Sequence, residues 1–183
     1  MAWPDIKEDI KGELPEEQQD PPSGLVHMDM HHGNLVFGDP PTDKEHGIAP
    51  ILKLIDFGST NYEEKGEREN IFSIGKVMLY LIYLEFVQPS EPPGGDIELE
   101  GKKIKSLATR VVPFPQEIDR RLITLVAAAM AENADNRPSL KYLFDRATRE
   151  IKSPAEFYKN KPEEQDDAVS QIWKDIIYNA PTS

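Results

Sequence analysis

The spacing of apolar side chains predicts helices in the second half of the chain. Between residue 70 and about residue 87, apolar residues recur at intervals of three and four, which places them on one face of a helix. The apolar segment 117–131 predicts a second helix that belongs to the core. For the first helix, we expect three residues at the centre of that core: Ile74, Met78 and Leu81.

Two further helices are predicted towards the C-terminus. Pro138 suits the first turn of a helix, where its missing N–H removes no hydrogen bond, and the helical pattern continues through Ile151. The stretch Val169–Tyr178 is amphipathic, so we expect its apolar face to dock on the body of the domain.

The first half of the chain carries short β-prone runs instead. Residues 24–26 and 34–37 flank a polar segment with three histidines, and residues 51–55 form the next run. Between them, residues 38–50 are rich in proline and predict a surface loop. The pattern as a whole predicts an α+β fold that is mainly α-helical, with a β-hairpin at about 25–55 ahead of the helices.

Composition and charge exclude several classes of function. The net charge is −12, and such a field repels a phosphate backbone, so we expect no nucleic-acid partner. The absence of cysteine excludes disulfides and a cysteine nucleophile. No apolar run is long enough for a membrane span, and the acidic start does not resemble a signal peptide. We expect a cytoplasmic or nuclear protein that makes no membrane contact.

Two motifs carry the candidate chemistry. Residues 27–34, His-Met-Asp-Met-His-His-Gly-Asn, fit the pattern H-x-D-x-x-x-x-N, and the D-F-G motif at 56–58 follows the run 51–55. In this order, each at the end of a predicted strand, they resemble the catalytic loop and metal-binding motif of eukaryotic-type protein kinases. The resemblance covers about residues 24–151 and includes a turn at 136–139 with the sequence Asn-Arg-Pro-Ser. In character it is similar to divergent fungal kinase-like proteins.

The resemblance implies a role for each motif residue. Asp29 would orient the acceptor hydroxyl and accept its proton, while Asn34 and Asp56 would bind Mg²⁺ and, through it, ATP. His31 occupies the position of a residue that contacts a phosphate of ATP, and His27 would brace the loop by packing and hydrogen bonding. The implied activity is transfer of phosphate from ATP to a protein hydroxyl, serine or threonine, so the expected partner is a protein.

The same resemblance divides the chain into three parts. Residues 1–23 form an acidic segment that would be a remnant of a preceding helix, residues 24–151 form the C-terminal lobe, and residues 152–183 form a helical extension. No G-x-G-x-x-G motif occurs, and the 26 residues before His27 offer no lysine-bearing strand and helical glutamate. We therefore expect a kinase-like C-lobe with the ATP-holding N-lobe absent.

Other positions depart from the family pattern. Met28 stands where arginine is usual, and only eleven residues, without an A-P-E sequence, lie between D-F-G and Asn70. Asn70 replaces an aspartate, and its side-chain oxygen would still accept hydrogen bonds from the catalytic-loop backbone. Arg137 would lack its usual glutamate partner, and Glu64 or Glu69 could take that place.

Several alternatives remain open at this point. The chain could be an inactive pseudokinase or a truncated fragment that acts as a protein-binding module, or a small-molecule phosphotransferase, since those enzymes share the H-x-D-x-x-x-x-N loop. A zinc or hydrolase site built from His27, Asp29, His31 and His32 would leave the D-F-G motif unexplained. For His32 and His46 we expect packing or solvated positions without a role in chemistry.

Overall fold

The computed structural model describes residues 24–38, 50–83, 88–89, 91–108, 118–152 and 160–178. Within these ranges the fold is α+β, with small antiparallel sheets and α-helices, which confirms the predicted class at this level. No helix in the described ranges is both long and apolar enough to cross a bilayer. The predicted acidic segment 1–23, most of the proline-rich loop including His46, and the predicted helix end near Val87 lie outside the described residues.

Two small sheets gather the strands that flank the motifs. Strand β1 (Leu25–Val26) pairs antiparallel with β4 (Asn61–Tyr62), and β2 (Leu35–Phe37) pairs antiparallel with β3 (Leu52–Leu54). The predicted hairpin is confirmed as the β2–β3 pair, whereas β4 was not predicted. Because β1 pairs with β4, the segment after D-F-G returns to the strand that precedes the histidine-rich loop.

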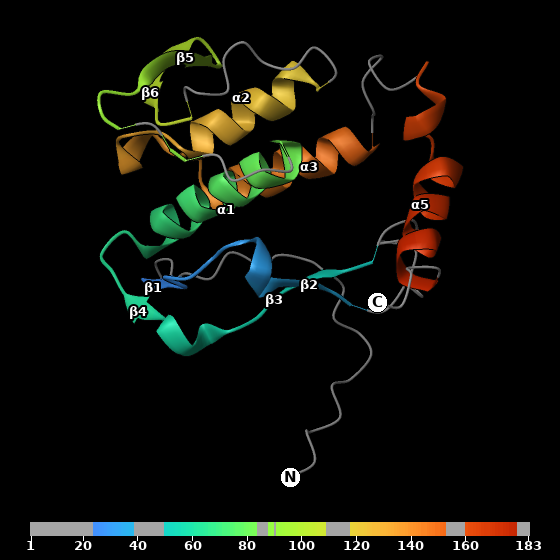
Figure 1. The fold of residues 1–183 in the computed structure, drawn as a ribbon. Coiled ribbons are helices and arrows are strands. Elements are labelled where there is room, and N and C mark those ends of the chain that lie inside the picture. The colour runs from blue at the N-terminus through green and yellow to red at the C-terminus, as the bar shows by residue number, and fades with distance from the viewer. Residues whose placement is uncertain are drawn as a thin grey trace.

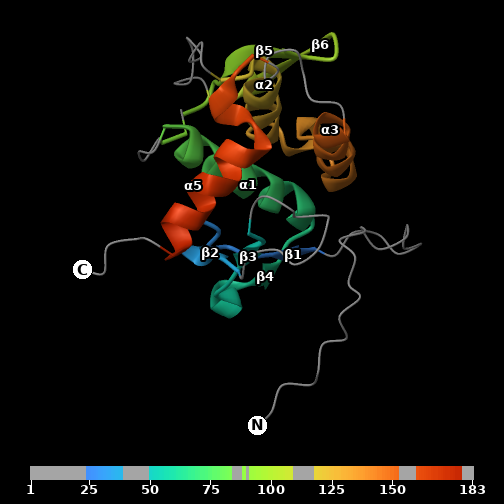
Figure 2. The same ribbon diagram turned by 90° about the vertical axis from the view of Figure 1, so that its right-hand side faces the viewer.

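Each predicted helix is present in the structure. They are α1 (Gly66–Tyr83), α2 (Arg120–Ala129), α3 (Leu140–Lys152) and α5 (Asp166–Tyr178). Helix α1 begins four residues earlier than predicted, and its first turn contains Glu67 and Glu69, which interact favourably with the positive end of the helix dipole. Figures 1 and 2 show α1 between two layers, with the β1–β4 and β2–β3 pairs below it and α2 above it.

The core lies where α1 crosses α2. Its buried residues are Leu79, Ala108, Ile123, Val126, Ala127 and Met130. Gly75 permits the close approach, because a Cβ there would lie 2.6 Å from Met130 Cγ. The predicted centre is confirmed only in part: Met78 is half-buried and packs against this cluster, and Ile74 is half-buried. Leu81 is 45% exposed, so its predicted central position is wrong. Leu81 follows Leu79 by two residues, which is about 200° around a helix and therefore on the other face.

A further hairpin covers the opposite side of α2. Strands β5 (Gly95–Leu99) and β6 (Lys102–Ser106) pair antiparallel around a turn at Glu100 and Gly101, both of which have positive φ. Such a turn matches the right-handed twist of the two strands. This hairpin was not predicted from the sequence. Figure 1 shows this hairpin at the top of the molecule.

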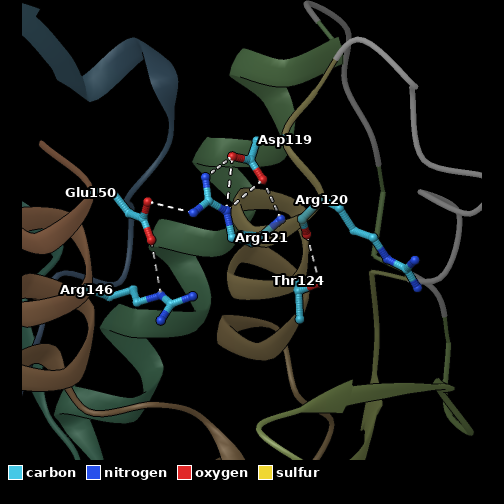
Figure 3. Close-up of polar contacts among 6 residues, drawn as sticks. All are labelled: Asp119, Arg120, Arg121, Thr124, Arg146 and Glu150. Carbon is cyan, nitrogen blue, oxygen red and sulfur yellow. Dashed lines mark hydrogen bonds and ion pairs between the residues drawn. The ribbon is translucent and has the colours of Figure 1, made fainter. Parts of the chain in front are cut away.

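A chain of charged side chains joins α2 to α3 (Figure 3). Arg121 contacts Asp119 at 2.5 Å and Glu150 at 2.9 Å, and Glu150 also lies 3.8 Å from Arg146. Asp119 caps α2 by accepting a hydrogen bond from the backbone N–H of Arg121. The hydrogen bond from the Arg121 side chain holds the pKa of Asp119 below its ordinary value, because it favours the charged carboxylate.

The last helix contacts the β2–β3 pair through an aromatic edge. The ring of Trp173 in α5 lies 4.5 Å from the ring of Phe37 in β2, with 64° between their planes. This contact agrees with the expected docking of the amphipathic stretch. Ile172 and Ile176 are about half exposed, so the apolar face of α5 is only partly covered within the described part of the chain.

Candidate functional site

The histidine-rich loop between β1 and β2 is anchored by the start of α1. The backbone N–H of His27 donates to Asn70 Oδ1 at 3.0 Å, and Asn70 Nδ2 donates to the carbonyl of Leu25 at 2.8 Å. The expectation that Asn70 accepts a hydrogen bond from the loop backbone is confirmed. One side chain of α1 therefore fixes the position at which the loop leaves β1.

His27 connects this loop to the D-F-G segment. It is buried, its Nε2 lies 3.0 Å from the carbonyl oxygen of Ile55, and its ring meets the edge of Phe57 at 4.9 Å. Because Nε2 faces a carbonyl, it must carry the proton, and Nδ1 is then buried with no hydrogen-bond partner among the described residues. The predicted bracing role is confirmed, because both contacts of the ring reach the segment around Asp56.

The carboxylate of Asp29 lies between two side chains of the same loop. Asn34 Nδ2 donates to the Asp29 carbonyl at 2.9 Å and lies 3.3 Å from Oδ2, while His31 Nε2 lies 3.6 Å from Oδ1. The side chain of Asp29 remains half exposed. A hydroxyl-bearing acceptor can therefore reach the carboxylate from solvent, as a general base requires.

The β2–β3 register brings the backbone of Asp56 close to that of Asn34. Leu35 pairs with Leu54, and the N–H of Ile55 donates to the carbonyl of Asn34 at 3.0 Å, so Asp56 follows directly at the end of the loop. Asp56 has φ 61° and ψ 69° and caps the short helix Phe57–Ser59. A left-handed backbone is uncommon outside glycine and is often found at functional positions.

The remaining donor atoms of this pair suit a hard divalent cation. Asn34 uses Nδ2 for Asp29, which leaves its amide oxygen, and Asp56 uses Oδ1 to accept from the N–H of Gly58 at 3.3 Å, which leaves Oδ2. Two such oxygens, completed by water and phosphate, match the preference of Mg²⁺. Across the residues that the structure describes, no three His, Cys, Asp or Glu side chains gather into a metal-binding group, so the four-residue zinc site considered above is not assembled.

His32 turns away from the carboxylates and packs on α1. Its ring stacks on Tyr80 at 3.7 Å with 4° between the planes. The expected packing role of His32 is confirmed. Neither Tyr80 nor its contact with the loop was predicted, because the two residues are 48 positions apart and tyrosine in a helix is common in any core.

A buried arginine secures the other end of the segment after D-F-G. Arg137 Nη1 lies 2.8 Å from Glu69 Oε1 and donates to the carbonyl of Arg68 at 3.0 Å, while its Nε donates to the carbonyl of Ala131 at 3.1 Å. Of the two glutamates considered as its partner, Glu69 is the one in contact. The guanidinium also lies 4.7 Å from the ring of Phe72, a cation–π contact that the sequence did not indicate.

A pocket elsewhere on the molecule carries a mixed set of charges. It lies between α2, α3 and β5, and its charged lining residues are Glu98, Glu100, Arg120, Arg121 and Arg146. Arg121 and Arg146 both pair with Glu150, as drawn in Figure 3. Glu100 accepts a hydrogen bond from the Tyr142 hydroxyl at 2.8 Å. No residue of the histidine-rich loop lines it, so we place the candidate site at the loop.

Comparison with known proteins assigns no family to the chain. No family model matches it, and no curated protein is similar to it at a significant level.

Proposed function

We propose that this chain carries the metal-binding and acceptor-binding half of a protein-kinase-type phosphotransferase site, which uses ATP and Mg²⁺ to phosphorylate a protein hydroxyl. The observation that carries the proposal is the position of Asn34. Its side chain contacts Asp29, and its backbone pairs with Ile55, the residue before Asp56. A carboxylate base and two metal donors thus come from one short loop and the adjacent strand end.

Each side chain has a defined task in this proposal. Asp29 orients the acceptor hydroxyl towards the phosphate and accepts its proton. Asn34 holds Asp29 through Nδ2 and offers its amide oxygen to the metal, while Asp56 offers a carboxylate oxygen. Bound Mg²⁺ would neutralise the charge on the phosphates. His27 keeps the D-F-G segment against the loop, so that the metal donors stay beside the base.

A paramagnetic metal tests the proposed donors directly. In the ¹⁵N-labelled chain, Mn²⁺ alone should broaden the amide signals of residues 34 and 56–58 before those of other residues, because broadening falls steeply with distance from the ion and reports binding too weak to shift the melting temperature. Combined replacement of Asn34→Ala and Asp56→Ala should remove this selective broadening. Asp96→Asn, which changes an exposed carboxylate on β5, is the matched control and should leave it intact. Broadening that begins elsewhere, or persists in the double variant, would contradict the proposed metal site.

A further inference from the structure

The ring of His31 is fixed by its own loop. Its Nδ1 accepts a hydrogen bond from the N–H of Gly33 at 3.0 Å, so the neutral ring carries its proton on Nε2. Gly33 leaves room for this arrangement, because a Cβ there would lie 2.8 Å from His31 Cε1 and 3.0 Å from Nδ1. Apart from the two residues adjacent to Gly33, no other described residue has an atom within 4 Å of this position. The hydrogen bond from Gly33 thus favours one orientation of the half-exposed ring.

A stack of rings supports His31 from behind. The ring of His32 meets it edge-on at 5.9 Å and in turn stacks on Tyr80 of α1 at 3.7 Å. The protonated Nε2 of His31 faces Asp29 Oδ1 at 3.6 Å, and Asn34 Nδ2 lies 3.3 Å from Oδ2. The terminal torsion of an aspartate is soft, so a small rotation brings Oδ1 within direct hydrogen-bond distance of Nε2.

We propose that His31 is a positioning residue for Asp29: its ring, held by Gly33 and the His32–Tyr80 stack, presents Nε2–H to the carboxylate, and not to a phosphate of ATP. The proposal rests on the proposed function, in which Asp29 is the base. With Asn34 on one carboxylate oxygen and His31 on the other, the side chain is confined to one orientation. The resemblance to kinases implied a phosphate contact at this position, and the contacts of both ring nitrogens favour the carboxylate instead.

The orientation of Asp29 can be measured without any turnover. In the full chain, the ¹³Cγ shift and the χ1 three-bond couplings of Asp29 report whether the side chain keeps one rotamer. We expect single-rotamer couplings in the parent, averaged couplings in His31→Ala, and recovery in His31→Gln, whose amide nitrogen can occupy the place of Nε2. A merely structural role in the loop would not distinguish these two variants at Asp29.

Gly33 provides a second, independent arm. Gly33→Ala should average the Asp29 couplings in the parent, because the new Cβ meets only the His31 ring, and should cause no further change in the His31→Ala background. Three outcomes would each overturn the proposal. The Asp29 couplings could stay unchanged in His31→Ala, His31→Gln could fail to restore them, or Gly33→Ala could have equal effects in the parent and in His31→Ala. Titration with inorganic phosphate tests the alternative role of His31, a contact with a phosphate of ATP. If the His31 ring signals shifted saturably and the Asp29 couplings did not respond to His31→Ala, His31 would be a phosphate contact and the proposal would be wrong. Because none of these signals requires metal or ATP, their failure is distinct from failure of the Mn²⁺ experiment.

Discussion

Replacing Arg137 tests whether the turn at 136–139 is held by buried backbone contacts or by an ion pair. Arg137→Met keeps much of the side-chain volume but removes the donors to the carbonyls of Ala131 and Arg68 and the contact with Glu69. A buried carbonyl left without a donor costs about 1–3 kcal/mol. Glu69 is 44% exposed, so its ion pair contributes at most about 1 kcal/mol. We expect the free energy of unfolding to fall by about 3 kcal/mol.

Urea unfolding followed by far-ultraviolet circular dichroism measures this change. Glu69→Gln is the matched control, because it removes the charge and keeps an oxygen that can accept from Arg137; it should cost less than about 1 kcal/mol. Arg137→Lys should resemble the methionine variant, since one ammonium group cannot reproduce the fork that contacts three acceptors. If Glu69→Gln cost as much as Arg137→Met, the ion pair and not the backbone contacts would hold the turn, and the reasoning would be refuted.

Three other predictions follow from the same structure. Met78→Asp should lower the free energy of unfolding by about 2–4 kcal/mol, because it places an unpaired charge against the core cluster. Leu81→Asp, on the exposed face of the same helix, should lower it by less than about 1 kcal/mol in the same urea assay. The pKa of Asp119 is lowered in the folded state, so its carboxylate stabilises the fold fully above the ordinary carboxyl pKa of about 4. This contribution is lost as the pH falls through the lower folded pKa. Urea midpoints measured between pH 6 and pH 3 should therefore fall less in Asp119→Asn than in the parent. The 183-residue chain alone should show neither autophosphorylation nor a thermal shift with millimolar ATP and Mg²⁺. It contains no glycine-rich loop that would hold the phosphates of ATP opposite the metal-binding residues. Phosphate labelling of the chain that disappears in Asp29→Ala would contradict this prediction.

The helices could be predicted because apolar residues recur along each of them at helical spacing. This spacing did not show exactly which face is buried or at which residues each helix begins and ends. Helix α1 buries Ile71, Gly75 and Leu79, and glycine at the closest crossing point carries no apolar signal. Its start at Gly66 depends on tertiary contacts of the first turn, such as the hydrogen bond from the N–H of Leu140 to Glu67.

The strands divide into those with a local signal and those without one. Strand β4 has two residues and exists through pairing with β1, 36 positions away, so no local pattern could reveal it. The β5–β6 hairpin did carry a signal: Ile97 and Ile104 alternate with charged neighbours around Glu100 and Gly101. This alternation was not used in the prediction, so the hairpin was missed although its signal is local.

For the candidate site, the motif residues were predicted and most of their supports were not. Spacing alone placed Asp29 and Asn34 in one loop, and the resemblance to kinases supplied the contact of Asn70. The orientation of His31 depends on Gly33 and on Tyr80, which lies 49 positions further along the chain. The position of His31 in the motif does not show which partner it contacts, because a phosphate and a carboxylate would both accept a hydrogen bond from the same Nε2–H.

Helix α1 supports the candidate site at two levels. Near its start, Glu69 contacts Arg137 and Asn70 holds the entry to the loop, and almost three turns later Tyr80 stacks on His32. The carboxylate of Asp29 is therefore positioned from a helix whose other face forms the core with α2. In this arrangement the geometry of Asp29 depends on the packing of α1, and no hydroxyl in the segment 59–65 contacts it among the described contacts. We therefore predict that any activity does not require a phosphate at Ser59, Thr60 or Tyr62, because folding of the chain positions Asp29 without modification of that segment.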